Sequence, residues 1–285
     1  MSTQAFDPVK FKAITRQQWD EVAQAWHHWM PVLRAWMAPA TELMLQLAQV
    51  DTGKRVLDVA AGDGDQTLTA AQRVGATGHV LAIDLAPNLV AIIEENARKT
   101  GLNNVEARVM DGENLELPDA SFDAAISRLG VMYFPDPVKG LNEMARVLKP
   151  NGRAAVLVFS TPDKNPFFSI AVSTVRRRAQ LPPPQPGMPG PFSLGAPGIL
   201  AETFRKAGYR DIEAQTVSVP LRMKSAVECL RFEQESFGAL HAMMAGMSED
   251  AKRDTWSEIE EGLRAYDSEH GFESPSEVII GVGVK

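Results

Sequence analysis

From residue 54 to residue 159, short apolar runs alternate with amphipathic segments of helical length. This alternation is typical of βα units around a parallel sheet, because strands covered on both faces are continuously apolar. Strands are expected at 56–60, 80–83, 105–110, 123–127 and 154–159, and helices at 66–74, 89–100 and 138–148. Pro150 and Gly152 follow the last of these helices and turn the chain. The pattern predicts an α/β fold.

The first fifty residues are expected to be helical, because large apolar residues recur at steps of three and four. They are Trp19, Val22, Trp26, Trp29, Leu33 and Trp36. Pro31 is predicted to kink or split this helix. Core packing is the favoured interpretation of the tryptophans, and a substrate-facing minority remains an alternative.

After residue 160 the regular alternation ends. We expect a helix at 167–178, an ordered irregular loop at 181–198, a helix from Pro197 to Ala207, a strand at 212–219, a helical stretch at 225–269 and a strand at 277–284. The predicted organisation has N-terminal helices (1–50), a core (51–160, 196–222 and 276–285) and a cap or substrate region (161–195 and 223–275). We predict that the two cap segments form a mobile, mostly helical lid over the carboxyl edge of the sheet.

Composition limits the partners and the location of the chain. The 285 residues have a formal net charge of −7, which opposes binding to nucleic acid or to an anionic membrane. No uncharged apolar run approaches the roughly 18 residues that a membrane span needs, and residues 1–12 have no apolar signal segment. The single cysteine, Cys229, excludes an intramolecular disulfide and a cysteine-built metal cluster. These features predict a cytoplasmic protein with no nucleic-acid partner and no membrane span.

A turn rich in small residues follows the first predicted strand. Residues 56–65 read VLDVAAGDGD, and Ala60, Gly62 and Gly64 allow a ligand to approach the backbone closely. Such turns commonly bind a dinucleotide, whose pyrophosphate rests on the helix N-terminus. Here Asp63 and Asp65 flank Gly64 and place carboxylates where phosphate charges would lie. The turn therefore favours a cationic ligand.

Two further aspartates follow later strands. Asp84 ends the second strand, where a carboxylate can accept hydrogen bonds from two ribose hydroxyls. Asp111 follows the third strand and can accept an exocyclic amine, and Gly112 leaves its own N–H approachable. Singly, each acid is explained better as a helix cap or a turn residue. Together with Asp58 at the same sheet edge, they predict a pocket for a positively charged adenosine derivative.

The chain resembles the class I S-adenosylmethionine-dependent methyltransferases, in particular the ubiquinone and menaquinone C-methyltransferase group. The resemblance rests on residues 56–64, 84, 111–112, 121–123 and 143–152. It implies a Rossmann-like αβα sandwich with a mostly parallel seven-stranded sheet. Ala60 replaces the usual glycine. We expect this replacement to displace the turn slightly and to leave cofactor binding intact. Asn151 replaces another glycine, and asparagine readily adopts left-handed conformations.

The resemblance implies that S-adenosyl-L-methionine is the cofactor and S-adenosyl-L-homocysteine the product. It implies that Asp58 reaches the ammonium group directly or through water, that Asp84 reaches the ribose and that Asp111 reaches the adenine amine. It also implies that Arg128 and Leu129 lie beside the methionine carboxylate and the reactive methyl group. The expected cofactor-binding residues are Asp58, Ala60, Gly62, Gly64, Asp84, Leu85, Asp111, Gly112, Arg128 and Leu129. For Arg128, a surface or helix-capping arginine is an alternative left open. Glu143 and Arg146 are assigned to structural pairing.

The expected reaction is direct in-line methyl transfer to an oxygen, nitrogen or carbon of a small molecule, for which no metal is required. A base is needed only for a protonated nucleophile. Its candidates are His27, His28, Tyr133 and His241, each of which is explained more simply as an ordinary packed or surface side chain.

Two other classes of protein remain open. One is a non-catalytic S-adenosylmethionine-binding protein. The other is a nicotinamide-dependent reductase, but no tyrosine has the lysine four residues later that short-chain reductases use. The acceptor and the oligomeric state are not determined by the sequence.

Overall fold

The computed structural model describes residues 6–183 and 187–285, so part of the predicted loop at 181–198 lies outside the described residues. The main sheet has seven strands in the order β3-β2-β1-β4-β5-β10-β6. They are β1 (Arg55–Val59), β2 (His79–Asp84), β3 (Val105–Val109), β4 (Phe122–Arg128), β5 (Leu148–Phe159), β6 (Arg210–Ser218) and β10 (Glu277–Val284). β10 runs antiparallel to β5 and β6, and β1 to β5 pair in parallel. The mostly parallel seven-stranded α/β fold is confirmed.

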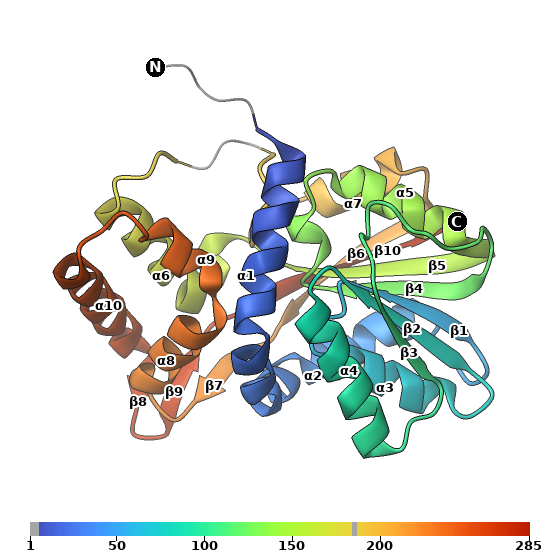
Figure 1. Ribbon diagram of the computed structural model, residues 1–285, viewed down its shortest axis with the longest axis horizontal. Coiled ribbons are helices and arrows are strands. Elements are labelled where there is room, and N and C mark those ends of the chain that lie inside the picture. Colours follow the sequence, from blue (N-terminus) through green and yellow to red (C-terminus); the bar gives the residue numbers. More distant parts are fainter. Residues whose placement is uncertain (1–5, 184–186) are drawn as a thin grey trace.

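Helices cover both faces of this sheet (Figure 1). They are α2 (Met30–Leu47), α3 (Asp65–Val74), α4 (Pro87–Thr100), α5 (Pro137–Val147) and α7 (Ile199–Lys206). α3 contacts α2 and α4 on one face, and α5 contacts α7 on the other. The strands and helices of the βα units begin and end close to the predicted residues, except that β5 begins at Leu148 and includes the predicted turn at Pro150 and Gly152. Asn151 lies within β5, where the pairing with β4 shifts register, and has φ +64°, the left-handed conformation expected for it.

The N-terminal helix splits where the sequence predicts. α1 (Pro8–His28) and α2 meet at Trp29, and Pro31 lies in the first turn of α2. Proline suits that position because the first helical N–H groups have no partner within the helix. α1 lies in front of the sheet edge in Figure 1 and contacts α4 on one side. It therefore lies close to the strand ends where the site was predicted.

A second group of elements lies to the left of α1 in Figure 1, with the main sheet to the right. It consists of α6 (Pro166–Arg178), α8 (Ala226–Ser236), α9 (Gly238–Met243), α10 (Glu249–Leu263) and the small sheet of β7 (Leu221–Met223), β9 (Gly271–Ser274) and β8 (Asp267–Ser268). The single helical stretch predicted at 225–269 was wrong. Ser225 accepts the N–H of Glu228 and Ser248 accepts that of Ala251, so two caps begin separate helices.

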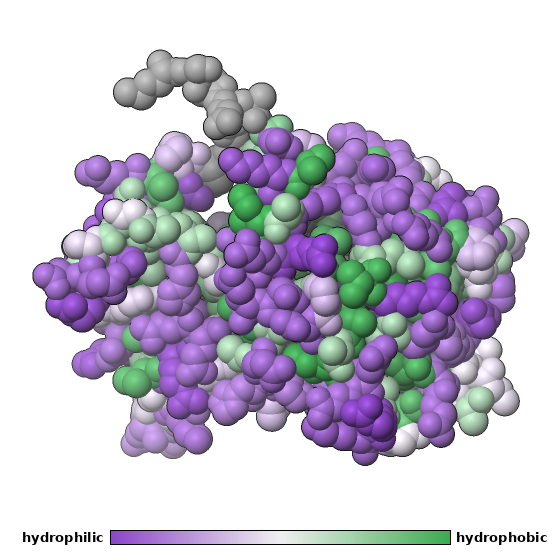
Figure 2. Space-filling view, viewed as in Figure 1, coloured by the Kyte–Doolittle hydropathy of each residue, from purple (hydrophilic) through white to green (hydrophobic). Residues whose placement is uncertain are grey.

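The face of the molecule in Figure 2 is mostly hydrophilic, with apolar side chains in small separate areas. Phe6, Val9 and Ile14, at the N-terminal end of α1, are among the exposed large apolar residues. Within residues 6–183 and 187–285, no helix combines the length and the apolar character that crossing a membrane requires.

Candidate active site

A cavity lies at the carboxyl ends of the parallel strands, beneath α1 and α2. Seven of the ten residues predicted to bind the cofactor line it: Ala60, Gly62, Asp84, Leu85, Gly112, Arg128 and Leu129. The three others, Asp58, Gly64 and Asp111, are not among its lining residues. The fold thus brings residues from the ends of β1, β2, β3 and β4 to one place, as expected for an open α/β sheet.

The turn after β1 is held in a left-handed backbone conformation. Ala60 has φ +55°, Gly62 +61° and Gly64 +85°. For alanine this conformation costs about 1–2 kcal/mol, which glycine would not incur. Gly130, in the loop after β4, faces the turn so closely that an added Cβ would overlap the Cβ of Ala60. The two loops are therefore packed backbone against backbone at the base of the cavity.

Asp84 is fixed by the turn that it faces. Its Oδ2 accepts a hydrogen bond from the N–H of Gly62 at 2.9 Å, and its Oδ1 accepts one from Ala86 at 3.0 Å. Burial raises the pKa of this carboxyl to about 6. Each carboxylate oxygen has a further lone pair, so the oriented group can still accept hydrogen bonds from a ligand in the cavity.

Asp58 lies beneath the turn rather than in the cavity. Its side chain is fully buried and accepts hydrogen bonds from Thr67 Oγ1 at 2.6 Å and Gln66 Nε2 at 3.3 Å. Burial raises the pKa of Asp58 to about 7. Asp58 thus attaches the first turns of α3 to β1. The predicted contact with a ligand ammonium group, direct or through water, stays a prediction.

Arg128 is a buried cavity residue, and its side chain is 8% exposed. Its Nη1 donates to Asp65 Oδ2 at 2.8 Å and to Thr41 Oγ1 at 3.0 Å. Asp65, the first residue of α3, also accepts from Arg34 Nε at 2.6 Å. The alternative of a surface arginine is therefore wrong, because Arg128 joins β4, α3 and α2 at the wall of the cavity.

Asp63 is a cavity residue that the sequence analysis noted but assigned no contact. Its side chain is 2% exposed, and its Oδ2 has no hydrogen-bond partner among the described residues. Burial raises the pKa of Asp63 to about 6, against the opposing effect of the nearby Arg128 charge. Its position between two glycines of the turn was the available sequence signal.

Asp111 is engaged by the N-terminal helix. Lys12 Nζ, from α1, donates to Asp111 Oδ2 at 2.6 Å and also forms an ion pair with Glu113. Asp111 Oδ1 accepts the N–H of Glu113 at 2.9 Å. Lys12 and Asp111 are distant in the sequence, so no local pattern could have revealed this contact. For the predicted contact, an adenine amine must either share the Asp111 carboxylate with Lys12 or displace Lys12 from it.

Aromatic side chains from α1 and α2 form much of the apolar wall. Trp19, Trp26 and Trp36 line the cavity, together with Tyr133. The Trp19 ring lies edge-on to Trp26 at a centroid distance of 5.2 Å and to Tyr133 at 6.0 Å. The cavity-facing group of tryptophans is thus larger than the minority that the sequence analysis allowed for.

The predicted cap contributes little to this wall. Within the described parts of segments 161–195 and 223–275, Phe237 is the one residue that lines the cavity. Phe167, Phe232 and Met244 are fully buried within the protein core. α8 and α9 of the second group contact α1, and α1 itself lines the cavity through Trp19 and Trp26.

Comparison with known proteins identifies the core of this fold. Residues 50–181 match a family model described as a methyltransferase domain. Residues 50–181 are therefore similar to a methyltransferase domain. The match begins just before β1 and ends after α6, so it contains the glycine-rich turn, Asp84, Asp111 and Arg128.

Two named relatives and one solved structure give the extent of this likeness. The demethylmenaquinone methyltransferase of Listeria welshimeri is 35% identical over 119 residues, 42% of this chain and 50% of that protein. The nocamycin O-methyltransferase of Saccharothrix syringae is 28% identical over 197 residues, 66% of this chain and 70% of that protein. The crystal structure of the YcgJ protein from Bacillus subtilis has a TM-score of 0.60 at 20% identity, covering 87% of this chain and 98% of that one. The chain spans about half the length of the first of these relatives.

The fold brings one of the four candidate bases to the cavity. Tyr133 lines it, and burial raises the pKa of its hydroxyl well above the ordinary value, so the group stays protonated. His27, His28 and His241 are not lining residues. His28 Nε2 lies 3.3 Å from Arg231 Nη2, and His241 Nε2 donates to the carbonyl of Gln234 at 2.7 Å.

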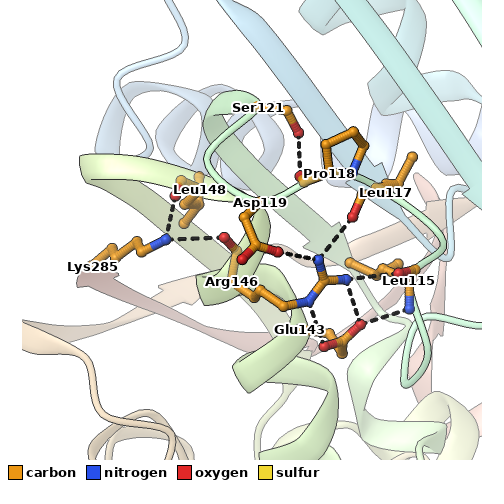
Figure 3. Close-up of polar contacts among 9 residues, drawn as sticks. All are labelled: Leu115, Leu117, Pro118, Asp119, Ser121, Glu143, Arg146, Leu148 and Lys285. Carbon is orange, nitrogen blue, oxygen red and sulfur yellow. Dashed lines mark hydrogen bonds and ion pairs between the residues drawn. The ribbon is translucent and has the colours of Figure 1, made fainter.

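Glu143 and Arg146 of α5 form the structural pair predicted for them. Figure 3 shows the Arg146 guanidinium donating to both carboxylate oxygens of Glu143, at 2.9 and 2.8 Å, and to Asp119 at 2.6 Å. The backbone carbonyls of Leu115 and Leu117 accept from the same guanidinium. The pair holds the segment before β4 against α5, and neither residue lines the cavity.

Proposed function

We propose that this protein transfers the methyl group of S-adenosylmethionine to a small, largely apolar organic acceptor. The observation that carries the proposal is a single cavity in which the glycine-rich turn and Asp84 face an aromatic wall from α1 and α2. A cofactor site and an adjoining apolar space are the two parts that a small-molecule methyltransferase needs.

The residues present fit an S-adenosylmethionine molecule. Asp84 is oriented by two backbone N–H groups and can accept the ribose hydroxyls, and Gly112 lines the same cavity. Arg128 and Asp63, whose Oδ2 has no hydrogen-bond partner among the described residues, supply opposite charges for an amino-acid group. The cofactor, when bound, supplies an electrophilic methyl group on a sulfonium.

The chain itself aligns the reactants and excludes water. Alignment alone can lower a barrier by about 7–11 kcal/mol. Trp26, Trp36 and Phe237 enclose the cavity with apolar surface, which keeps water from competing with the acceptor. Because the Tyr133 hydroxyl stays protonated, its role is to donate a hydrogen bond to an acceptor oxygen.

An acceptor that ionises readily requires no base from the chain. The relatives named for demethylmenaquinone and for nocamycin support a small organic acceptor. We propose the same substrate class here, with transfer by in-line displacement.

We also propose that segments 161–195 and 223–275, whose residues 184–186 lie outside the described structure, close together with α1 over the bound molecules. α8 and α9 both contact α1, so they can stabilise it over the cavity. An enclosed site admits a small molecule and excludes a folded macromolecule. The net charge of −7 opposes binding to nucleic acid, and we propose a cytoplasmic protein without a nucleic-acid partner.

The test is release of S-adenosylhomocysteine when the protein is mixed with S-adenosylmethionine and a panel of phenols, quinols and polyketide-like ring compounds. Turnover should occur with at least one apolar ring compound and should be strongly reduced in Asp84→Ala. Cofactor binding without turnover on any acceptor would favour the non-catalytic binding protein. Binding of a nicotinamide cofactor instead would favour the reductase.

A further inference from the structure

Four acidic side chains surround the glycine-rich turn, and three of them are already paired. Asp58 accepts from Thr67 and Gln66, and Asp65 accepts from Arg34 and Arg128. Asp84 accepts from two backbone N–H groups. The chain therefore satisfies these carboxylates from within the fold.

Asp63 differs from these three acids. It is 2% exposed, it lines the cavity, and its Oδ2 is buried without a hydrogen-bond partner among the described residues. Burying an unpaired carboxylate oxygen is costly, so such a group is uncommon unless a ligand completes it. A cationic hydrogen-bond donor in the cavity would supply the missing partner.

Arg128 indicates which kind of cation fits. Its guanidinium lines the same cavity as Asp63, and the two charges are close enough for Arg128 to oppose the effect of burial on the Asp63 pKa. A carboxylate acceptor and a guanidinium donor in one cavity match the ammonium and the carboxylate of an α-amino acid. A hydroxyl group or a simple metal cation would match only one of them.

We propose that Asp63, rather than Asp58, receives the ammonium group of the methionine part of the cofactor, with Arg128 on the carboxylate side. This inference rests on the proposed function, because it assumes that S-adenosylmethionine occupies the cavity. Asp63 is then the residue that makes binding depend on the amino group. Asp58 keeps a structural role in joining β1 to α3.

The experiment compares two ligands by calorimetry. One is S-adenosylhomocysteine, and the other is its analogue with the amino group replaced by hydrogen, which keeps the adenosine, the sulfur and the carboxylate. Wild-type protein should bind S-adenosylhomocysteine more tightly. Asp63→Asn preserves the size of the side chain and removes its charge, so it should weaken S-adenosylhomocysteine by at least about tenfold. The same variant should bind the amino-free analogue as well as the wild type or better.

Asp58→Asn tests the rival assignment, and it should change the affinities for the two ligands by similar factors. A selective loss of S-adenosylhomocysteine in Asp58→Asn, or equal effects of Asp63→Asn on both ligands, would overturn the inference. Thermal unfolding of each variant confirms that it is folded. Failure of folded wild-type protein to bind either ligand would instead overturn the proposed function, and with it this assignment.

Discussion

Gly130 is a position where one added methyl group would disturb the base of the cavity. A Cβ at residue 130 would overlap the Cβ of Ala60 and would lie 3.0 Å from Ser127 Oγ. Both neighbours are in the base of the cavity, where the turn after β1 meets the loop after β4. Gly130→Ala should therefore destabilise the protein by about 1–3 kcal/mol through overpacking, and should also weaken cofactor binding.

Ala60→Gly provides the compensating change. It removes the Cβ that causes the overlap, and it relieves a left-handed alanine that costs about 1–2 kcal/mol. The gain is offset by about 0.5–1 kcal/mol, because glycine loses more conformational freedom on folding. Alone, this substitution should be close to neutral. Combined with Gly130→Ala, it should restore about 1 kcal/mol or more, with the Ser127 contact limiting full recovery.

Urea unfolding followed by circular dichroism measures the free energy of unfolding of the four proteins in this cycle. Gly246→Ala is the matched control, because an added Cβ there meets nothing within 4 Å, and it should stay within about 0.5 kcal/mol of the wild type. If the effects of the two substitutions add within about 0.5 kcal/mol, the direct contact between residues 60 and 130 is refuted.

Three further predictions concern ligand binding. Burial raises the pKa of Asp84 to about 6. Because the ionised carboxylate binds the ligand, the affinity for S-adenosylhomocysteine should fall about tenfold between pH 7.5 and pH 5. A calorimetric affinity that does not change with pH would contradict this. Lys12→Ala frees Asp111 from its ion pair and should speed association in stopped-flow fluorescence, whereas an unchanged rate would show that the lysine does not compete. Hydrogen exchange in α1 and in segments 161–195 and 223–275 should slow when S-adenosylhomocysteine binds; exchange as slow as that of β1 without ligand would argue against a closing cap.

The sequence was sufficient to predict the βα core because its signals are local. Each buried strand is an apolar run and each helix has its own periodicity, so the elements from residue 54 to residue 159 could be placed without knowledge of their partners. The site followed from topology, since the carboxyl ends of parallel strands share one edge. Asp84, Gly62 and Arg128 accordingly meet in the cavity.

What the sequence did not predict depends on contacts between distant residues. The pairing of β7 with β9 joins segments that are far apart in the chain, and short strands have little periodicity to reveal them. The contact of Lys12 with Asp111 arises only when α1 lies across the sheet edge. Ser248 is different, because its capping signal is local and could have divided the predicted helical stretch at 225–269.

The most direct test of the account is calorimetric titration of S-adenosylhomocysteine into the folded wild-type protein and Asp84→Ala. The wild type should bind with micromolar affinity, about −8 kcal/mol. Asp84→Ala should lose two hydrogen bonds to a charged acceptor, worth about 1.5–3 kcal/mol each, and should bind at least about tenfold more weakly. No heat of binding to folded wild-type protein, or equal affinity in the two proteins, would contradict the assignment of this cavity as the cofactor site.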